Sequence, residues 1–230
     1  MEPALIIFDC DGVLIDSEML AAGALIDALR QNGVTVELDF VARHFIGRAF
    51  PTVPREVKAR FGLDLPASFE EDYRSRLFAA FAAGLSPMAG VVETLAALRV
   101  PFCVATSSSP PRLAASLRLA GLDGLFAGRC FTASQVARGK PAPDLFLHAA
   151  AQMGVDPLSC VVVEDSPAGI AAGFAAGMEV WHFVGGAHFA VMDMPPPTGM
   201  APHRRFARFS EIRAARPELF HRPAGMADPI

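Results

Sequence analysis

One apolar run near the N-terminus ends in two acidic residues, and this arrangement constrains the fold more than any other feature. The run Ala4–Phe8 is followed at once by Asp9, Cys10 and Asp11. Side chains two residues apart in an extended chain point the same way, so Asp9 and Asp11 can share one site. Open α/β sheets bind ligands outside the carboxyl ends of their strands, and Gly12 permits the sharp bend needed there. Two neighbouring carboxylates repel each other unless a cation is present, which indicates Mg²⁺.

Composition and charge exclude several classes of protein. Hydrophobic residues make up 52% of the 230 residues and charged residues 19%, so the chain can bury a sizeable core and is not disordered. The net charge is −4 and no basic run is longer than Arg204-Arg205, so we expect no nucleic-acid partner. The longest apolar-looking stretch, Leu77–Leu85, is too short to span a bilayer, and no signal peptide is evident, so we expect a cytoplasmic protein without a membrane partner. No pattern indicates an oligomeric state.

Short apolar runs alternate with helical patterns in the rest of the chain. The runs are Phe102–Thr106, Cys130–Thr132, Cys160–Glu164 and Val180–Phe183, and helical patterns separate them at about residues 90–99, 111–120, 143–153 and 166–176. This alternation predicts βαβ units and a parallel sheet. Gly169, Gly173 and Gly177 recur every four residues along the last helical pattern. In a helix of about a dozen residues, this spacing indicates close packing on the sheet and not a membrane motif.

Residues 17–85 interrupt the alternation with amphipathic helical patterns and no convincing strand. We therefore predict a Rossmann-like α/β core with an α-helical insertion. The core comprises residues 1–16 and 86–215, the insertion residues 17–85, and a loose C-terminal tail residues 216–230.

The four cysteines share one predicted state. They lack C-x-x-C spacing, and each lies in or beside an apolar run: Cys10, Cys103, Cys130 and Cys160. We predict buried free thiols. Cys10 alternates away from the two acids, so we do not assign it a reactive role.

Polar residues follow three further apolar runs, at the edge where parallel strands end. Thr106, Ser107 and Ser108 end the run at Phe102, and backbone N–H groups after Thr106 can form an anion nest. Glu164 and Asp165 end a fully apolar run, where buried carboxylates are costly without a cation or hydrogen bonds. The alternatives are an ordinary serine-rich turn and acids that cap the next helix.

The stretch from Asp9 to Ser17 matches the pattern D-x-D-G-x-[LV]-x-D-[ST]. It resembles the first motif of the haloacid dehalogenase-like hydrolases, most of which are Mg²⁺-dependent phosphatases and phosphomutases. The resemblance implies that Asp9 is the nucleophile that forms an aspartyl-phosphate, and that Asp11 is the general acid and base. Both roles suit the chemistry of a carboxylate.

Three more segments resemble the later motifs of that family, in the required order. The run ending at Thr106 resembles the second, whose hydroxyl binds the transferred phosphoryl group. Lys140-Pro141-Ala142-Pro143-Asp144 resembles the third, K-P-x-P-[DE], and implies that Lys140 neutralises charge on the phosphoryl group and Asp9. Glu164–Gly169 resembles the fourth. It implies Mg²⁺ bound by Asp165, by Glu164 directly or through water, by Asp9 and by the backbone carbonyl of Asp11.

The resemblance also assigns a role to the helical insertion. In the family a helical cap domain occupies this place, closes over the active site and excludes water. Gly47 corresponds to the glycine with which that cap reaches the site, and Arg48 follows it. We therefore predict substrate contacts from Gly47, Arg48, Ser107 and Ser108. A helical subdomain with no lid role is the alternative.

The order of elements and the E-D-S-x-A-G form of the fourth motif are most similar to the β-phosphoglucomutase and sugar-phosphate phosphatase branch. Cys103–Ser107, Phe146–Ala150 and Gly177–Val180 resemble its 6-phosphogluconate phosphatase-like members. β-Phosphoglucomutases carry a Lys-Asn pair just past the second motif, where this chain has Ser109-Pro110.

These features favour one function over two alternatives. We predict a Mg²⁺-dependent phosphatase that acts on a small phosphorylated metabolite, such as a sugar or sugar-acid phosphate. A sugar phosphomutase is the alternative. A receiver-type signalling domain is a remote one, because it would lack the helical insertion.

Overall fold

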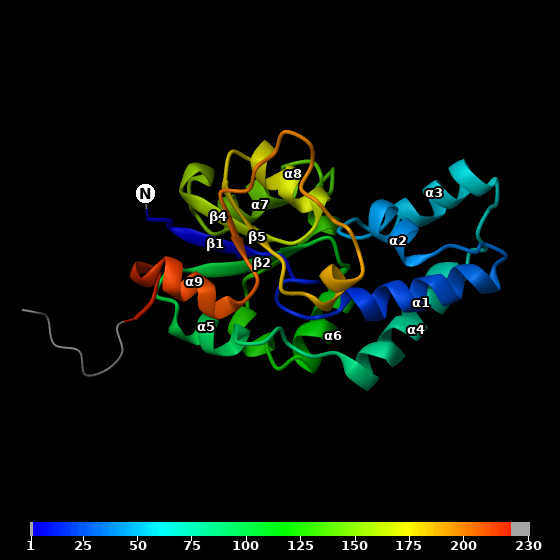
Figure 1. The fold of residues 1–230 in the computed structure, drawn as a ribbon, viewed down its shortest axis with the longest axis horizontal. Helices are drawn as coiled ribbons and strands as arrows, with labels where there is room; N and C mark the ends of the chain where they lie inside the picture. The colour runs from blue at the N-terminus through cyan, green and yellow to red at the C-terminus, as the bar shows by residue number, and fades with distance from the viewer. Residues whose placement is uncertain (1, 222–230) are drawn as a thin grey trace, which may run out of the picture.

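A six-stranded parallel sheet forms the centre of the computed structural model, which describes residues 2–221 (Figure 1). The strands are β1 (Leu5–Phe8), β2 (Phe102–Thr106), β3 (Cys130–Thr132), β4 (Cys160–Glu164), β5 (Glu179–Phe183) and β6 (Arg204–Phe206). They lie in the order β3-β2-β1-β4-β5-β6, and each neighbouring pair is parallel. The predicted α/β fold with a parallel sheet is confirmed.

Helices cover both faces of the sheet, and the side chains of β1 point alternately to one face and to the other. Ile6 and Phe8 pack on one face, in a cluster with α5 (Val91–Ala97), α6 (Pro110–Leu119) and α9 (Phe209–Ala215). Leu5 and Ile7 pack on the other face, with α7 (Asp144–Gln152) and α8 (Pro167–Ala175). Burial on both faces explains why the strands read as continuous apolar runs in the sequence.

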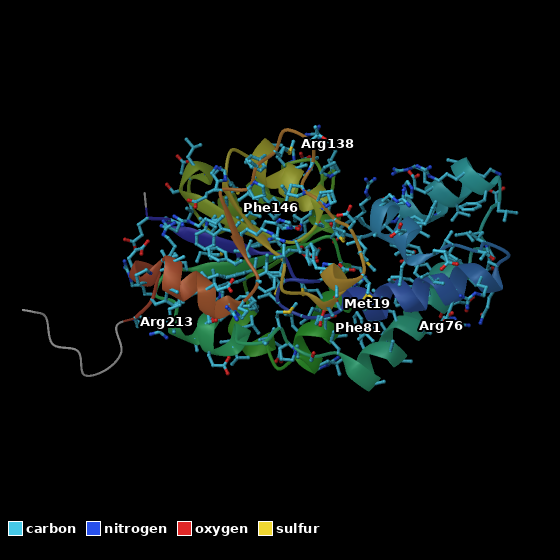
Figure 2. All side chains as sticks on the ribbon, viewed as in Figure 1. Met19, Arg76, Phe81, Arg138, Phe146 and Arg213 are labelled. Atoms are coloured by element: carbon cyan, nitrogen blue, oxygen red, sulfur yellow. The ribbon has the colours of Figure 1, made fainter. Side chains whose placement is uncertain are left out.

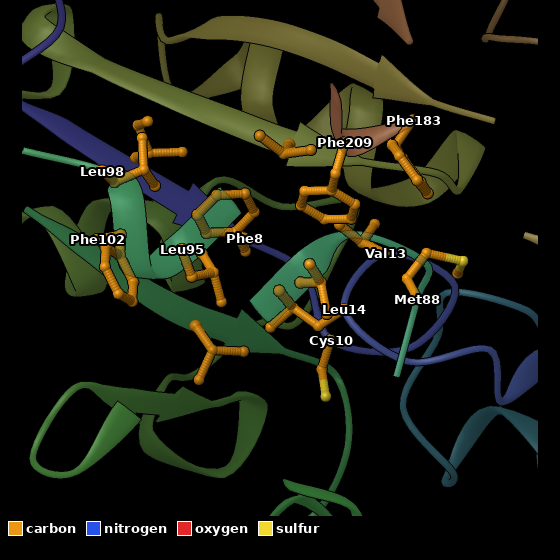
Figure 3. Packing of buried hydrophobic residues seen from close by; sticks show 14 of the residues in the cluster. Phe8, Cys10, Val13, Leu14, Met88, Leu95, Leu98, Phe102, Phe183 and Phe209 are labelled. Carbon is orange, nitrogen blue, oxygen red and sulfur yellow. The ribbon is translucent and has the colours of Figure 1, made fainter. Parts of the chain in front are cut away.

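Phe8 lies at the centre of the first cluster (Figure 3). Its ring centroid is 6.3 Å from that of Phe102 and 6.2 Å from that of Phe209. Edge-to-face and tilted aromatic contacts of this kind stabilise a core beyond the area they bury. The packing holds the end of β1 in place immediately before Asp9.

Four helices form a separate lobe beyond the carboxyl ends of the strands, at the right of Figure 1. They are α1 (Glu18–Gln31), α2 (Leu38–His44), α3 (Thr52–Phe61) and α4 (Phe69–Gly84), and we call them the cap. The cap has its own hydrophobic cluster, to which Met192 and Met194 from the segment after β5 also contribute. Figure 2 shows Met19 on α1 and Phe81 on α4 at the end nearest the core. No helix within residues 2–221 is long and apolar enough to cross a bilayer.

The predicted helical insertion is confirmed, since residues 17–85 contain only helices and connecting segments. The two separate hydrophobic clusters support domain boundaries near Asp16 and Ser86, and we propose that the core resumes at Ser86.

The C-terminal part of the core contains elements that the sequence pattern did not predict. Strand β6 lies at the edge of the sheet, and only Phe206 of its three residues is buried. Arg204 and Arg205 are exposed, so the strand carries almost no apolar signal. Helix α9 follows it and buries Phe209 and Ile212 in the core.

The first residues of the predicted C-terminal tail pack on the core instead. Residues 216–221 pack on the core, with Leu219 and Phe220 buried in the first cluster, so the prediction of a loose tail from residue 216 is wrong for them. Phe220 forms an isolated antiparallel bridge with Leu98. Residues 222–230 of the predicted tail lie outside the described residues.

Small residues on α8 allow the close packing that the glycine spacing indicates. A Cβ atom on Gly173 would lie 2.7 Å from Cγ2 of Val180, on the sheet.

The four cysteines are free, as predicted, although Cys130 is only partly buried. Cys10 belongs to the first hydrophobic cluster, on the side of the chain away from the two acids.

Candidate active site

Neighbouring strands bring the predicted residues together at one edge of the sheet. Because β2, β1 and β4 are adjacent, the residues that follow them meet at their carboxyl ends. These residues are Thr106 at the end of β2, Asp9 and Asp11 after β1, and Glu164 and Asp165 at and directly after the end of β4. All five are buried, and burial of the four acids is unusual without charged partners.

Lys140 connects two of the carboxylates. Its Nζ atom donates to Oδ1 of Asp9 at 2.5 Å, to Oε1 of Glu164 at 2.7 Å and to the carbonyl oxygen of Ala105 at 3.1 Å. The Lys140 side chain is 1% exposed, so the charge is neutralised within the protein and not by water. Burial opposes the charged amine, but Asp9 and Glu164 outweigh it and raise the pKa of Lys140 above its usual value. The lysine therefore remains a cation beside the predicted nucleophile.

The acids around Asp9 form a group that can hold a metal ion. One oxygen each of Asp9, Glu164 and Asp165 lies within 4.8 Å of the others. Burial raises the pKa of Asp9 and of Asp165, and in both cases the negative charge of Glu164 adds to the effect. A divalent cation removes this cost, because it stabilises the ionised forms.

Asp165 has a carboxylate oxygen that makes no hydrogen bond, although Nε2 of His188 lies 3.1 Å from it. This oxygen is Oδ2, and it is buried. Both oxygens of Glu164, in contrast, accept bonds from the protein: Oε1 from Lys140, and Oε2 from the backbone N–H and the hydroxyl of Ser166 at 2.7 and 3.0 Å. An orphaned carboxylate oxygen among hard oxygen donors fits Mg²⁺.

Asp11 has a different environment from Asp9. Its carboxylate accepts hydrogen bonds from the hydroxyls of Ser17 at 2.7 Å and Ser108 at 2.6 Å, and from Nη2 of Arg112 at 2.6 Å. Burial acts to raise the pKa of Asp11, but Arg112 and the two hydroxyls outweigh it and lower the pKa below its usual value. In this arrangement Asp11 is an anion.

Two glycines are required by this packing. Gly12 has φ +76°, and a Cβ atom there would lie 2.0 Å from Oδ2 of Asp165. A Cβ atom on Gly169 would lie 1.7 Å from Oε1 of Glu164. The backbone therefore approaches both carboxylates where no side chain fits.

A cap loop touches the core at the predicted glycine. Gly47 has φ +73°, and a Cβ atom there would lie 2.3 Å from the hydroxyl oxygen of Ser166. Its carbonyl oxygen accepts a hydrogen bond from Ser107 at 3.1 Å. Arg48, the next residue, is exposed. In the core, the Thr106 hydroxyl accepts a bond from the backbone N–H of Ser108 at 3.1 Å.

A cavity of about 370 Å³ lies between this edge of the sheet and the cap. Seven of the predicted residues line it: Asp9, Asp11, Gly47, Arg48, Thr106, Ser107 and Ser108. Lys140, Glu164 and Asp165 do not line the cavity. Lys140 donates a hydrogen bond to Asp9, and Glu164 and Asp165 lie beside Asp9 in the acidic cluster. This volume is in the range of pockets that hold small molecules.

Three residues of this region were not predicted. Arg112, on α6, binds Asp11, and its guanidinium lies 5.5 Å from the ring centre of Phe81 in the cap. His188 is fully buried, with Nε2 3.1 Å from Oδ2 of Asp165. Glu18 lines the cavity at the start of α1, and burial with the nearby acids raises its pKa to about 8.

The sequence offered weak signals for these residues. Glu18 directly follows the first motif, and Arg112 lies a few residues after the serine cluster. His188 lies in a segment with no motif, so its place beside Asp165 follows only from the fold.

Comparison with known proteins identifies the family of this chain. The model of the haloacid dehalogenase-like hydrolase family matches residues 3–177, and the chain belongs to this family. It is 30% identical over 184 residues to 6-phosphogluconate phosphatase of Escherichia coli K12, an alignment that covers 80% of this chain and 83% of the relative. It is 33% identical over 178 residues to hexitol phosphatase A of the same organism, with 76% and 80% covered.

Solved structures give the same result. A crystal structure of a conserved haloacid dehalogenase-like protein of unknown function from Agrobacterium tumefaciens matches with a TM-score of 0.75 and 33% identity, covering 94% of this chain and 98% of that one. The predicted family is therefore confirmed. The protein is an enzyme of the hydrolase class, and the curated relatives named above are phosphatases.

Proposed function

We propose that this protein is a Mg²⁺-dependent phosphatase that hydrolyses a small phosphorylated metabolite through an aspartyl-phosphate on Asp9. The observation that supports this most strongly is the placement of Asp9. It lines the cavity between core and cap, and the buried amine of Lys140 holds its Oδ1 atom. The similarity to 6-phosphogluconate phosphatase and hexitol phosphatase supports a sugar or sugar-acid phosphate as substrate.

The reaction uses the two aspartates in turn. With Oδ1 bound to Lys140, Oδ2 of Asp9 attacks phosphorus, and the bond between phosphorus and the substrate alcohol oxygen breaks. Asp11 gives a proton to that leaving oxygen. It then takes a proton from water, which attacks the aspartyl-phosphate, releases phosphate and restores Asp9. The Thr106 hydroxyl and nearby backbone N–H groups bind the phosphoryl oxygens.

Asp11 must change partners before it can donate a proton. Arg112, Ser17 and Ser108 hold it as an anion in the structure. Three donors lower the pKa of a carboxyl, so Asp11 carries no proton to give until one or more of them leave and it takes up a proton from water. We infer that substrate binding displaces Arg112 or Ser108 from Asp11, so that the acid form becomes available only in the loaded site.

The metal would be held by oxygen donors of this chain. Asp9 and Asp165 would bind it directly, together with the backbone carbonyl of Asp11 that the family resemblance implies, and Glu164 would act through water because both its oxygens accept hydrogen bonds from the protein. When bound, Mg²⁺ neutralises charge on the phosphoryl group. Lys140 supplies a second positive charge beside Asp9.

A phosphomutase remains the competing function, and one observation weighs against it. Ser109 and Pro110 open α6 where the mutases carry a lysine and an asparagine for the second phosphate. Ser109 lines the cavity but brings no positive charge to it.

Phosphate release from purified protein tests the proposal. We expect turnover of phosphate monoesters with Mg²⁺, none after chelation, and recovery when Mg²⁺ is returned. Ca²⁺ should inhibit, because it prefers more and longer oxygen contacts than this site provides. Metal-independent turnover would contradict the metal assignment, and a strict requirement for a bisphosphorylated sugar would favour the mutase.

A further inference from the structure

The cavity between core and cap has two chemically different surfaces. The core supplies a polar floor, which includes Asp9, Thr106, Ser107, Ser108 and Arg112. The cap supplies a wall that is largely apolar, and its buried members include Leu25, Val41, Phe45, Ile46, Val53 and Leu77. These side chains are between 1% and 7% exposed and belong to the hydrophobic cluster of the cap, so the surface that they present to the cavity is apolar.

The charged side chains of the cap lie mainly at the rim. Arg48 and Glu70 line the cavity but are exposed, and Arg74 is half-buried. Nη2 of Arg74 donates to Oε1 of Glu70 at 2.6 Å, so these two charges are already paired. They therefore provide no hydrogen-bond partners for a substrate that lies against the deeper part of the wall.

Only two buried cap residues that line the cavity can form hydrogen bonds through their side chains. These are Glu18 at the start of α1 and Tyr73 on α4. Tyr73 also carries aromatic surface, and the ring of Phe50 stacks on it at 5.5 Å with an interplanar angle of 15°. The wall therefore offers aromatic and aliphatic contacts with very few polar partners.

This distribution of polar and apolar side chains favours one chemical type for the part of the substrate that carries the phosphate. An open-chain polyol carries hydroxyls along its whole length, and those against the wall would lose their hydrogen bonds to water without replacement. A flat aromatic ring instead gains from the removal of apolar surface from water and from contact with Phe50 or Tyr73. The floor and Glu18 still provide partners for a few hydroxyls close to the phosphate.

Resting on the phosphatase function proposed above, and narrowing its substrate away from the open-chain compounds in the names of the two relatives, we propose that the substrate is a sugar phosphate that carries a flat aromatic ring, as a nucleoside 5′-monophosphate does. The phosphate lies at Asp9 and the hydroxylated sugar lies between Ser108 and Glu18. The ring lies against the cap wall, in contact with Leu25 and its neighbours.

A pair of monoesters that differ only in the ring tests this assignment. Uridine 5′-monophosphate and ribose 5-phosphate share the same primary phosphate ester, and 6-phosphogluconate provides an open-chain comparison. With Mg²⁺, kcat/KM for uridine 5′-monophosphate should exceed that of both others by about tenfold or more. Equal or better turnover of ribose 5-phosphate or 6-phosphogluconate would overturn the proposal and leave the phosphatase function intact.

Two leucines one turn apart on α1 provide matched variants. Leu25 lines the cavity, whereas Leu29 is equally buried in the cap cluster but does not line it. Leu25→Ala should lower the ratio of kcat/KM for uridine 5′-monophosphate over ribose 5-phosphate by about fivefold. Leu29→Ala should leave that ratio unchanged, whatever it does to stability. Equal ratios in the two variants would show that the wall does not contact the substrate.

Binding separates this inference from the proposed function. Titration calorimetry on the Asp9→Asn protein with Mg²⁺ measures affinity for the same two monoesters without turnover. Tighter binding of uridine 5′-monophosphate, with no phosphate released by the unmodified protein, would support the ring site and reject the phosphatase. Equal affinity would reject the ring site.

Discussion

The polar floor and the apolar wall of the cavity differ in the chemistry of their buried side chains. On the floor, almost every charged group already has a partner: Lys140 binds Asp9 and Glu164, and Asp11 accepts from Arg112 and two serines. On the wall, the buried side chains are apolar except for Glu18 and Tyr73, and the other charges lie at the exposed rim.

The difference indicates that the two regions have different functions. The floor is preorganised by buried ion pairs and hydrogen bonds, which is what phosphoryl transfer requires. The wall consists of helices with their own hydrophobic cluster, so its lining can vary without disturbing the floor. Substitutions should therefore alter chemistry on one side and substrate recognition on the other.

The largest expected effect separates an aspartate of the floor from one of the cap. Asp9→Asn should lower turnover by about 10⁴-fold or more, because an amide cannot attack phosphorus or bind the metal as an anion. Asp27→Asn changes an exposed residue on α1 and should have no effect. Phosphate release and circular dichroism of both variants provide the measurement. Substantial turnover by a folded Asp9→Asn protein would reject the aspartyl-phosphate mechanism.

Two helical glycines give the next comparison. Gly169→Ala places a methyl group 1.7 Å from Oε1 of Glu164, and should lower both the free energy of unfolding, by about 2 kcal/mol, and turnover. Gly23 in α1 has nothing within 4 Å of its Cβ position, so Gly23→Ala should raise the free energy of unfolding by about 0.5–1 kcal/mol. Denaturant unfolding of both variants is the test. Similar changes in the two would contradict the tight packing of α8 on Glu164.

Glu18 lies where the two regions meet, and its raised pKa makes stability depend on pH. Its pKa is about 8 in the folded protein against a usual 4.5, so the folded state retains a proton that the unfolded state loses between these values. Stability should therefore fall as the pH rises from about 4.5 to 8. Glu18→Gln cannot ionise, and in metal-free protein it should exceed the unmodified protein in stability by about 4 kcal/mol at pH 8 and by little at pH 4.5.

Unfolding midpoints across that pH range test the role of Glu18. Glu71→Gln, at an exposed position on α4, is the matched control and should show no such trend. A difference between Glu18→Gln and the unmodified protein that stays constant with pH would show that the carboxyl of Glu18 is not held neutral by burial.

The smallest expected effect concerns the rim of the wall. Arg48→Ala should raise KM for the best substrate by about tenfold, since a hydrogen bond to a charged group contributes about 1.5 kcal/mol. Hydrolysis of methyl phosphate, which offers the cap little to hold, should change little. Arg43→Ala removes an exposed arginine of α2 outside the cavity and serves as control. Equal losses on both substrates would place Arg48 in the catalytic floor.

The sequence was most informative about residues that follow apolar strands. Asp9, Thr106 and Asp165 could be placed at one edge of a parallel sheet, because the carboxyl ends of parallel strands lie at the same edge. It was least informative at β6, where Arg204 and Arg205 give no apolar pattern on an exposed edge. The packing of Leu219 and Phe220 was missed for a similar reason, since two apolar residues near a terminus form no periodic signal.

By itself, the sequence determined the order of the elements as far as β5, the helical insertion and the floor residues other than Arg112, because these depend on local periodicity and on fixed spacing within motifs. The tertiary structure decided which distant residues meet them. Arg112 reaches Asp11 from 101 positions away, and His188 comes to lie beside Asp165. The tertiary structure also decided which apolar residues of the cap line the cavity. Leu25 and Leu29 follow the same apolar pattern in the sequence, but in the packed cap Leu25 lines the cavity and Leu29 does not.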